Sequence, residues 1–304
     1  MTQGPKKDVA HSIRQRLQQI ARTSGRPFQE IFQYFVMERF LYRVSRSRYA
    51  DKFVLKGALM FTAWKAAEFR PTRDIDFLGK TGNDRDEIAA AFREICENET
   101  EPDGLRFDAA SLEANVIKED ADYEGVRVTF VAYLEKARFA MQIDVGFGDV
   151  TIPDPLMTEY PTLLELPAPR LKGYSRETVV AEKFEAMTKL GMLNSRMKDF
   201  FDLWSLSRQF DFDGATLARA IEATFRHRGT EVIAVPTALT QEFAADATKQ
   251  TQWTAFVRKT RLAEAPGDLA AVIEALARFL SPVAEAVATG APLTKRWRAP
   301  GPWA

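Results

Sequence analysis

The stretch Phe53-Val-Leu-Lys-Gly-Ala-Leu-Met-Phe-Thr-Ala-Trp64, followed by Arg70-Pro-Thr-Arg-Asp-Ile-Asp-Phe77, decides how this chain folds. Its first part is an apolar, strand-like run that ends at a glycine and continues as a helix-like run. Its second part places Asp74 and Asp76 one residue apart on the next expected strand. Side chains at i and i+2 of a strand lie on one face, so both carboxylates can be presented together. The stretch predicts a binding site for a divalent metal ion beside a candidate phosphate-binding turn.

The segments around this stretch predict an α+β fold. Apolar residues at helical spacing indicate two helices before it, and a third is expected after Asn83 or Asp84. β-rich runs follow at about 112–117, 126–134 and 139–145. A proline-rich passage at 152–169 marks a change of character, and helices are expected downstream, at 177–190, 197–208, 214–225, 240–258 and 268–288. We predict a mixed sheet flanked by helices, with N-terminal helices and a helical C-terminal domain, divided into residues 1–160 and 161–304.

The composition is that of an ordinary globular protein. The chain has 304 residues, which is enough for roughly two domains with a sizeable core. Its single cysteine, Cys96, cannot form an internal disulfide, and the polar N-terminus does not resemble a signal peptide. No segment approaches the ~20 continuous apolar residues of a membrane span. We therefore expect a cytoplasmic protein with no membrane partner.

Basic residues are concentrated near the N-terminus. Residues 1–56 contain twelve lysines and arginines against four aspartates and glutamates, an excess of eight positive charges (12 − 4). A basic flank suits a polyanionic partner such as RNA. Solvated helix faces explain the same pattern equally well.

The aspartates fit the requirements of phosphoryl or nucleotidyl transfer. That chemistry places charge on phosphate oxygens, which carboxylate-held divalent ions can neutralise. Magnesium needs only two or three such ligands, and Asp144, in an apolar strand-like run, could join Asp74 and Asp76 as a third. Gly57 would let backbone amides approach a phosphate. The alternatives are a turn or cap for the Asp-x-Asp pair, a tight turn at Gly57 and a loop cap at Asp144.

Two further clusters lie in the helical half. The helix period places Lys183 among Val179 and Met187 on one face, where its ammonium can snorkel to solvent or meet a triphosphate. Asp199 and Asp202 are three residues apart and share a helical face. The alternative for these aspartates is a charged, capped helix start.

Together these motifs resemble the AbiEii/AbiGii toxin family of nucleotidyltransferases, within the polymerase-β-like superfamily. The resemblance runs from about Ile20 to Leu206. In order, it covers Glu38-Arg-Phe-Leu-Tyr-Arg-Val-Ser-Arg-Ser, Phe53-Val-Leu-Lys-Gly, Arg70-x-Thr-x-Asp-Ile-Asp76, Ala181-Glu-Lys183 and Arg196-x-Lys-Asp199-x-x-Asp202-Leu. Several weak motifs in the family's order make one strong signal.

The resemblance implies a nucleotidyltransferase-like fold and a magnesium-dependent transferase, with manganese as an alternative ion. Its substrate would be a nucleoside triphosphate, and the likeness implies that Asp74 and Asp76 bind the metal, that Lys183 lies near the phosphates and that Asp199 is a further active-site carboxylate. Members of the family that this chain resembles act as growth-inhibiting toxins in toxin–antitoxin or phage-defence loci. Some modify the 3′ end of tRNA, and the partner antitoxin is typically a winged-helix protein.

We expect a cleft between the α/β core and the helical domain, with RNA as the acceptor. The predicted catalytic residues are Asp74, Asp76, Lys183 and Asp199, with Asp144 or Asp199 assisting as ligand or base. Arg70 and Arg73 would stabilise the triphosphate, and Lys56 and the N-terminal arginines would follow the RNA backbone. The complete predicted nucleotide- and phosphate-binding set is Lys56, Gly57, Ala58, Arg70, Arg73, Asp144 and Asp202, and the metal set is Asp74, Asp76 and Asp144.

Three points stay open at this stage. The family glycine is usually followed by serine or glycine, whereas Ala58 offers no hydroxyl. The same metal site would serve phosphorylation or nucleotidylation of a protein. A degenerate module that only binds nucleic acid is the third possibility.

Overall fold

The computed structural model describes residues 5–67, 69–120, 123–260, 262 and 265–304. The chain forms two compact units, each made of separate segments. The first unit comprises Met1–Lys65, Thr72–Gly148 and Leu156–Gly173, and the second comprises Ala66–Pro71, Asp149–Pro155 and Tyr174–Ala304. A division into domains at residue 160 stays a prediction.

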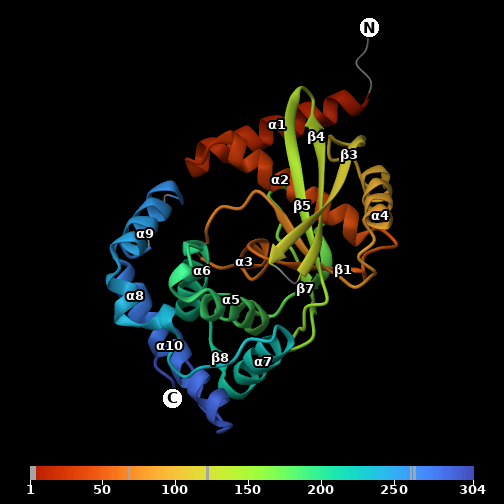
Figure 1. The fold of residues 1–304 in the computed structure, drawn as a ribbon. Coiled ribbons are helices and arrows are strands. Elements are labelled where there is room, and N and C mark those ends of the chain that lie inside the picture. The colour runs from red at the N-terminus through yellow and green to blue at the C-terminus, as the bar shows by residue number, and fades with distance from the viewer. Residues whose placement is uncertain (1–4, 68, 121–122, 261, 263–264) are drawn as a thin grey trace. The chain divides into compact units, whose positions relative to one another are not determined.

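The first unit is built on a mixed seven-stranded sheet in the order β3-β4-β5-β2-β1-β7-β6 (Figure 1). β2 runs parallel to β5 and β1 runs parallel to β7, whereas the other neighbouring strands are antiparallel. The mixed sheet confirms the predicted fold class. The strands are β1 (Phe53–Lys56), β2 (Ile75–Gly79), β3 (Leu105–Asp120), β4 (Tyr123–Leu134), β5 (Ala137–Phe147), β6 (Leu156–Glu159) and β7 (Arg170–Gly173).

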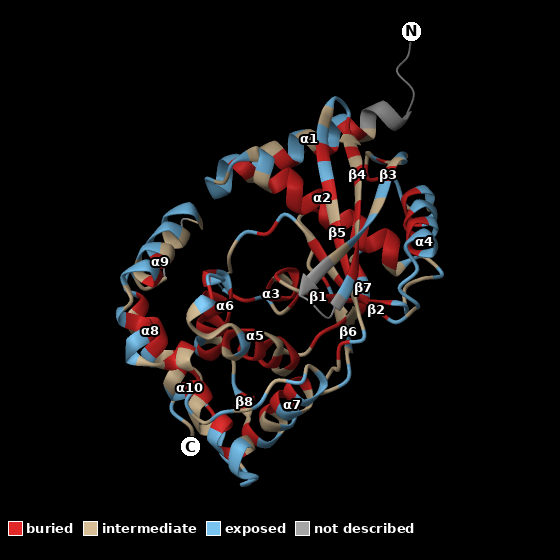
Figure 2. Cartoon of the chain, viewed as in Figure 1, coloured by how far each residue is buried: buried red, intermediate tan, exposed pale blue. Residues whose placement is uncertain are grey.

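Helices of the first unit cover the sheet through an aromatic core. They are α1 (Pro5–Ser24), α2 (Phe28–Ser45), α3 (Leu59–Ala63) and α4 (Arg85–Glu97). α2 is buried without interruption from Ile31 to Val44, and Figure 2 shows it red along most of its length. Phe40 of α2 stacks on Phe92 of α4 with ring centroids 6.1 Å apart. The ring centroid of Phe130 of β4 lies 5.2 Å from that of Phe40. A helix that is buried on every side organises the core around itself.

α2 also carries charges into this core. Arg43 Nη1 lies 2.6 Å from Asp103 Oδ2, and Arg39 Nε lies 3.2 Å from the same oxygen. Both arginines are buried, and Arg39 Nη1 donates to the carbonyl oxygen of Pro167. The expectation that the N-terminal arginines follow an RNA backbone is therefore wrong for these two residues, which neutralise a buried carboxylate instead.

The second unit is helical, as predicted. Side chains cap α5 (Arg176–Leu190) and α7 (Gly214–His227): Ser175 Oγ accepts from the Thr178 N–H, and Asp213 Oδ1 accepts from the Thr216 N–H. The described part of the chain holds no helix long and apolar enough to cross a membrane. The elements are α5 (Arg176–Leu190), η1 (Gly191–Leu193), α6 (Met197–Gln209), β8 (Phe212–Asp213), α7 (Gly214–His227), η2 (Thr237–Leu239), α8 (Gln241–Ala245), α9 (Ala247–Thr260), α10 (Leu269–Thr289) and β9 (Arg296–Trp297).

Candidate active site

Gly57 and Asp76 are brought into contact at the end of β1. The antiparallel register pairs Lys56 with Asp76, and Gly57 then adopts a φ of +71°. A Cβ on Gly57 would lie 1.9 Å from Asp76 Oδ2. Only glycine both accepts this backbone conformation and leaves room for the carboxylate. The glycine of the motif therefore shapes the site of the second aspartate.

The other two residues of this turn that were predicted to bind phosphate are buried. Lys56 is only 9% exposed and Ala58 only 5% exposed. Ala58 begins α3 without a side-chain cap, and α3 spans only five residues. Phosphate binding by Lys56, Gly57 and Ala58 stays a prediction.

Asp74 is held in place by a buried threonine. Thr72 Oγ1 accepts from the Asp74 backbone N–H at 3.5 Å. Thr72 is fixed by α2 in turn, because its carbonyl oxygen accepts from Gln33 Nε2 and its N–H donates to Tyr34 Oη at 3.3 Å. Thr72 belongs to the Arg70-x-Thr-x-Asp-Ile-Asp76 motif, and its role becomes visible only in the folded structure.

Asp74 and Asp76 alternate with buried Ile75, as the strand pattern predicted. Both aspartates are half-buried, and Ile75 is fully buried. Carboxylate oxygens are ligands of the kind that magnesium prefers. These residues therefore fit a divalent ion.

Asp144 is engaged by an arginine that the sequence analysis missed. Asp144 of β5 is the register partner of Asp76, and on its other side it pairs with Arg127 of β4. Arg127 Nε donates to Asp144 Oδ1 and Nη2 donates to Oδ2, both at 2.8 Å. Across the described residues, no group of three or more Asp, Glu, His or Cys side chains is placed to hold a metal ion. The signal for Arg127 was its charge within an otherwise apolar expected strand.

The second unit contains a compact charge cluster centred on Lys183 of α5. Its ammonium lies 2.6 Å from Asp199 Oδ1 and 2.8 Å from Asp202 Oδ2, both on α6. Arg196 Nε lies 2.7 Å from Asp199 Oδ2, and Arg70 Nε lies 3.0 Å from Asp202 Oδ1. The structure thus unites three predicted residues of the helical half with Arg70, and it adds Arg196.

Burial and charge decide the protonation of this cluster. Burial opposes the charge on Lys183, but Asp199 and Asp202 raise the pKa of its ammonium above the ordinary value. Burial likewise opposes ionisation of Asp199, but Lys183 and Arg196 lower the pKa of Asp199 to about 2. Because Asp199 is fully buried and ionised, it suits the orientation of Lys183 better than the acceptance of a proton.

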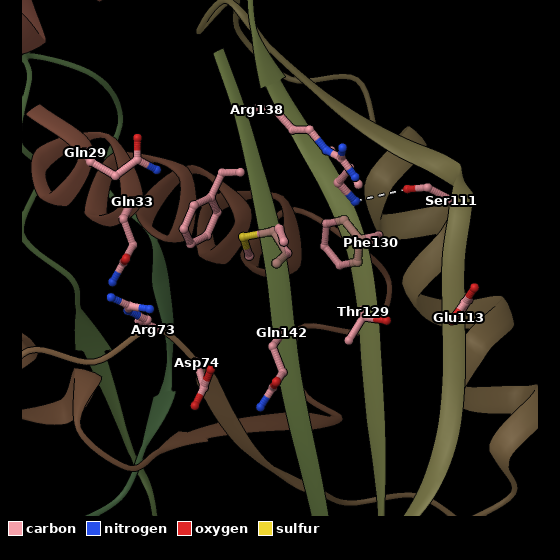
Figure 3. A pocket seen from close by; sticks show the side chains of 14 residues that line it. Gln29, Gln33, Arg73, Asp74, Ser111, Glu113, Thr129, Phe130, Arg138 and Gln142 are labelled. Atoms are coloured by element: carbon pink, nitrogen blue, oxygen red, sulfur yellow. Dashed lines mark hydrogen bonds between the residues drawn. The ribbon is translucent and has the colours of Figure 1, made fainter.

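A groove of about 750 Å³ lies in the first unit beside Asp74. We call it the sheet groove. Figure 3 shows Asp74 and Gln142 at one end of it and Ser111 with Arg138 at the other. Its walls include Gln29 and Gln33 of α2, Arg73 and Asp74 before β2, and Arg138 and Gln142 of β5. Arg73, a predicted phosphate contact, is thus an exposed wall of this groove.

Comparisons with known proteins find one matching family and two similar solved structures. A family model described as "Nucleotidyl transferase AbiEii toxin, Type IV TA system" matches residues 39–281. The crystal structure of JHP933 from Helicobacter pylori matches with 14% identity and a TM-score of 0.49, over 86% of this chain and 93% of that one. A proposed nucleotidyltransferase from H. pylori matches with 16% identity and a TM-score of 0.45, over 86% and 96% of the two chains. No curated protein sequence matches.

Proposed function

Because the chain belongs to the AbiEii family of nucleotidyl transferase toxins from type IV toxin–antitoxin systems, we propose that it transfers a nucleoside monophosphate from a nucleoside triphosphate to an RNA. The expected acceptor is the 3′ end of a tRNA. The observation that carries the proposal is the contact between Gly57 and Asp76, where a Cβ would lie 1.9 Å from the carboxylate oxygen. A backbone turn that leaves room for one carboxylate only because residue 57 is glycine favours a role for that carboxylate in binding or catalysis.

Asp74 and Asp76 are the proposed holders of the divalent ion, with magnesium expected and manganese as a substitute. When bound, such an ion neutralises phosphate charge and aligns the reacting groups. Thr72 fixes the backbone of Asp74 and Gly57 gives Asp76 its position, so the protein pre-sets both ligands. Asp144, the third proposed ligand, also accepts two hydrogen bonds from Arg127.

The Lys183 cluster is the proposed binding site for the triphosphate. Lys183, Arg70 and Arg196 carry three positive charges against two on Asp199 and Asp202, which leaves one excess positive charge (3 − 2). The carboxylates keep the ammonium protonated, and a protonated lysine attracts phosphate oxygens.

The proposed biological setting is the cytoplasm, where the modified tRNA would block growth, with phage defence as one context. The proposed protein partner is a winged-helix antitoxin. The antitoxin is supported by the family alone. The RNA acceptor is supported by the excess of basic residues that residues 1–56 keep when Arg39 and Arg43 are set aside.

The test is a labelling reaction with total RNA, magnesium and a nucleoside triphosphate labelled on its α-phosphate. We expect label in tRNA, loss of at least a hundredfold in Asp76→Asn, and full activity in Arg93→Gln, a substitution on the exposed side of α4. No labelled RNA with any of the four nucleotides, or unchanged labelling in Asp76→Asn, would refute the proposal.

The same reaction separates the alternatives. Label from the γ-phosphate instead of the α-phosphate would identify phosphorylation, and a product that resists nuclease but not protease would identify a protein acceptor. Magnesium-dependent nucleotide binding without any transfer would indicate a binding module.

A further inference from the structure

The sheet groove has the chemistry of a nucleobase site rather than a phosphate site. Its charged walls balance, because Arg73 and Arg138 are matched by Asp74 and Glu113. A triphosphate would need an excess of positive charge, which this groove does not supply.

Neutral groups that both donate and accept hydrogen bonds dominate the remaining polar wall. Gln29, Gln33 and Gln142 line the groove from two elements, together with the hydroxyl of Thr129. A carboxamide presents a donor and an acceptor side by side, which is the pattern that pairs with the edge of a base. The arginine side chains can add stacking over the face of the base.

The groove is open on the polar face of the sheet. Thr129 of β4 and Gln142 of β5 are direct register partners, and Glu113 of β3 is the register partner of Thr129. The three side chains therefore form one row across neighbouring strands. A flat base fits such a floor, with the α2 glutamines as a side wall (Figure 3).

We propose that the sheet groove binds the base of the unpaired terminal nucleotide of the acceptor RNA. This inference rests on the proposed transferase function and assigns the acceptor's place within it. Asp74 lines the end of the groove, so a nucleotide bound there has its ribose close to one of the proposed metal ligands. The volume of about 750 Å³ lies in the usual range for a site of one small ligand.

Gln142 ties this base site to the carboxylates. Its Nε2 lies 3.4 Å from Asp144 Oδ2, and with the amide turned over its oxygen accepts from Arg127 Nε and Nη2, each at 3.3 Å. A base that bonds to Gln142 therefore competes with the Arg127–Asp144 pair for the same amide. For this reason the test uses groove residues that do not touch that pair.

The experiment measures binding without catalysis, in the full chain carrying Asp76→Asn. The probe is a fluorescent single-stranded RNA hexamer, and its dissociation constant is followed by fluorescence anisotropy. Gln29→Ala and Arg138→Gln should each weaken binding about three- to tenfold, the usual range for one lost hydrogen bond. Arg93→Gln on α4 removes the same charge outside the groove and should change binding less than twofold.

Two further arms identify what occupies the groove. A hexamer whose last nucleotide lacks its base should bind the parent protein at least as weakly as the groove variants bind the intact hexamer, and the groove variants should not weaken its binding further. A hexamer ending in 4-thiouridine should crosslink on irradiation to peptides containing Gln29 or residues 129–142.

The outcomes separate this inference from the proposed function. Equal binding of the intact and abasic hexamers, or crosslinks confined to the second unit, would overturn the base site even if the wild-type protein labels RNA. Groove variants that bind a fluorescent nucleoside triphosphate more weakly, but bind the RNA hexamer as tightly as the parent protein, would also overturn it. The groove would then hold the incoming nucleotide. Failure of the labelling reaction alone would refute transfer and leave these binding results standing.

Discussion

Replacing Gly57 by alanine tests whether the turn after β1 exists to place Asp76. The new Cβ would lie 1.9 Å from Asp76 Oδ2 and 2.8 Å from its Cγ, in a backbone with φ of +71°. The left-handed conformation costs an alanine about 1–2 kcal/mol. Moving a carboxylate anchored on an internal strand adds about 1–3 kcal/mol, as in overpacked cores. We expect the free energy of unfolding to fall by about 2–5 kcal/mol in total, the sum of these two ranges.

Gly148→Ala is the matched control within the same unit. Gly148 has a φ of +81°, and a Cβ there would meet no heavy atom within 4 Å. The free energy of unfolding of this variant should fall only by the cost of the left-handed backbone conformation, about 1–2 kcal/mol. Urea denaturation followed by circular dichroism gives both values. The difference between the two variants measures the displacement of Asp76.

Manganese binding supplies the functional half of the test. Electron paramagnetic resonance should show weaker Mn²⁺ binding in Gly57→Ala and unchanged binding in Gly148→Ala, because only the first moves a proposed ligand. Equal stability losses in the two variants, together with equal Mn²⁺ affinity, would show that the contact with Asp76 is incidental.

Three further predictions concern paired or buried charges. Asp199→Asn should cost about 2–3 kcal/mol at pH 7 in urea denaturation, which corresponds to lowering the pKa of Asp199 from 3.8 to about 2 in the folded protein. This stabilisation should vanish as the pH falls from about 4 through 2, and curves that stay apart in acid would contradict it. Burial raises the pKa of Glu38 to about 7, so the folded protein should lose stability as the pH rises from about 4.5 to 7, a slope that thermal unfolding should no longer show in Glu38→Gln. Arg127→Gln should strengthen Mn²⁺ binding about fivefold by freeing Asp144. Asp144→Asn should weaken Mn²⁺ binding. Unchanged Mn²⁺ affinity in both variants would remove Asp144 from the ligand set.

Local rules predicted the parts of the site that lie close together in the sequence. Strand alternation correctly placed Ile75 in the core beside a half-buried Asp76, whereas Asp74 lies just before β2 and its common face with Asp76 stays a prediction. The helical period correctly gave Asp199 and Asp202 a common face, and both reach Lys183. These inferences needed only the geometry of one strand or one helix.

Pairings set by distant elements lay beyond such rules. Arg127 meets Asp144 because the β4–β5 hairpin fixes their register, and a shift of one residue would have turned one of them to the other face. Arg39 and Arg43 counted as surface charge in the sequence because their partner, Asp103, comes about sixty residues later. Sheet order and helix burial decide such pairs, and neither is visible in a local pattern.

The division of the chain between its two units also limits how the units can be separated, either by evolution or by experiment. The backbone passes from one unit to the other after Lys65, Pro71, Gly148, Pro155 and Gly173. No single gene fusion, splice or proteolytic cut can therefore release either unit intact, and a cut at one junction leaves the others as tethers. Relatives should vary by exchange of loops within each unit rather than by swapping whole halves, and the Asp74 and Lys183 groups should be gained or lost together.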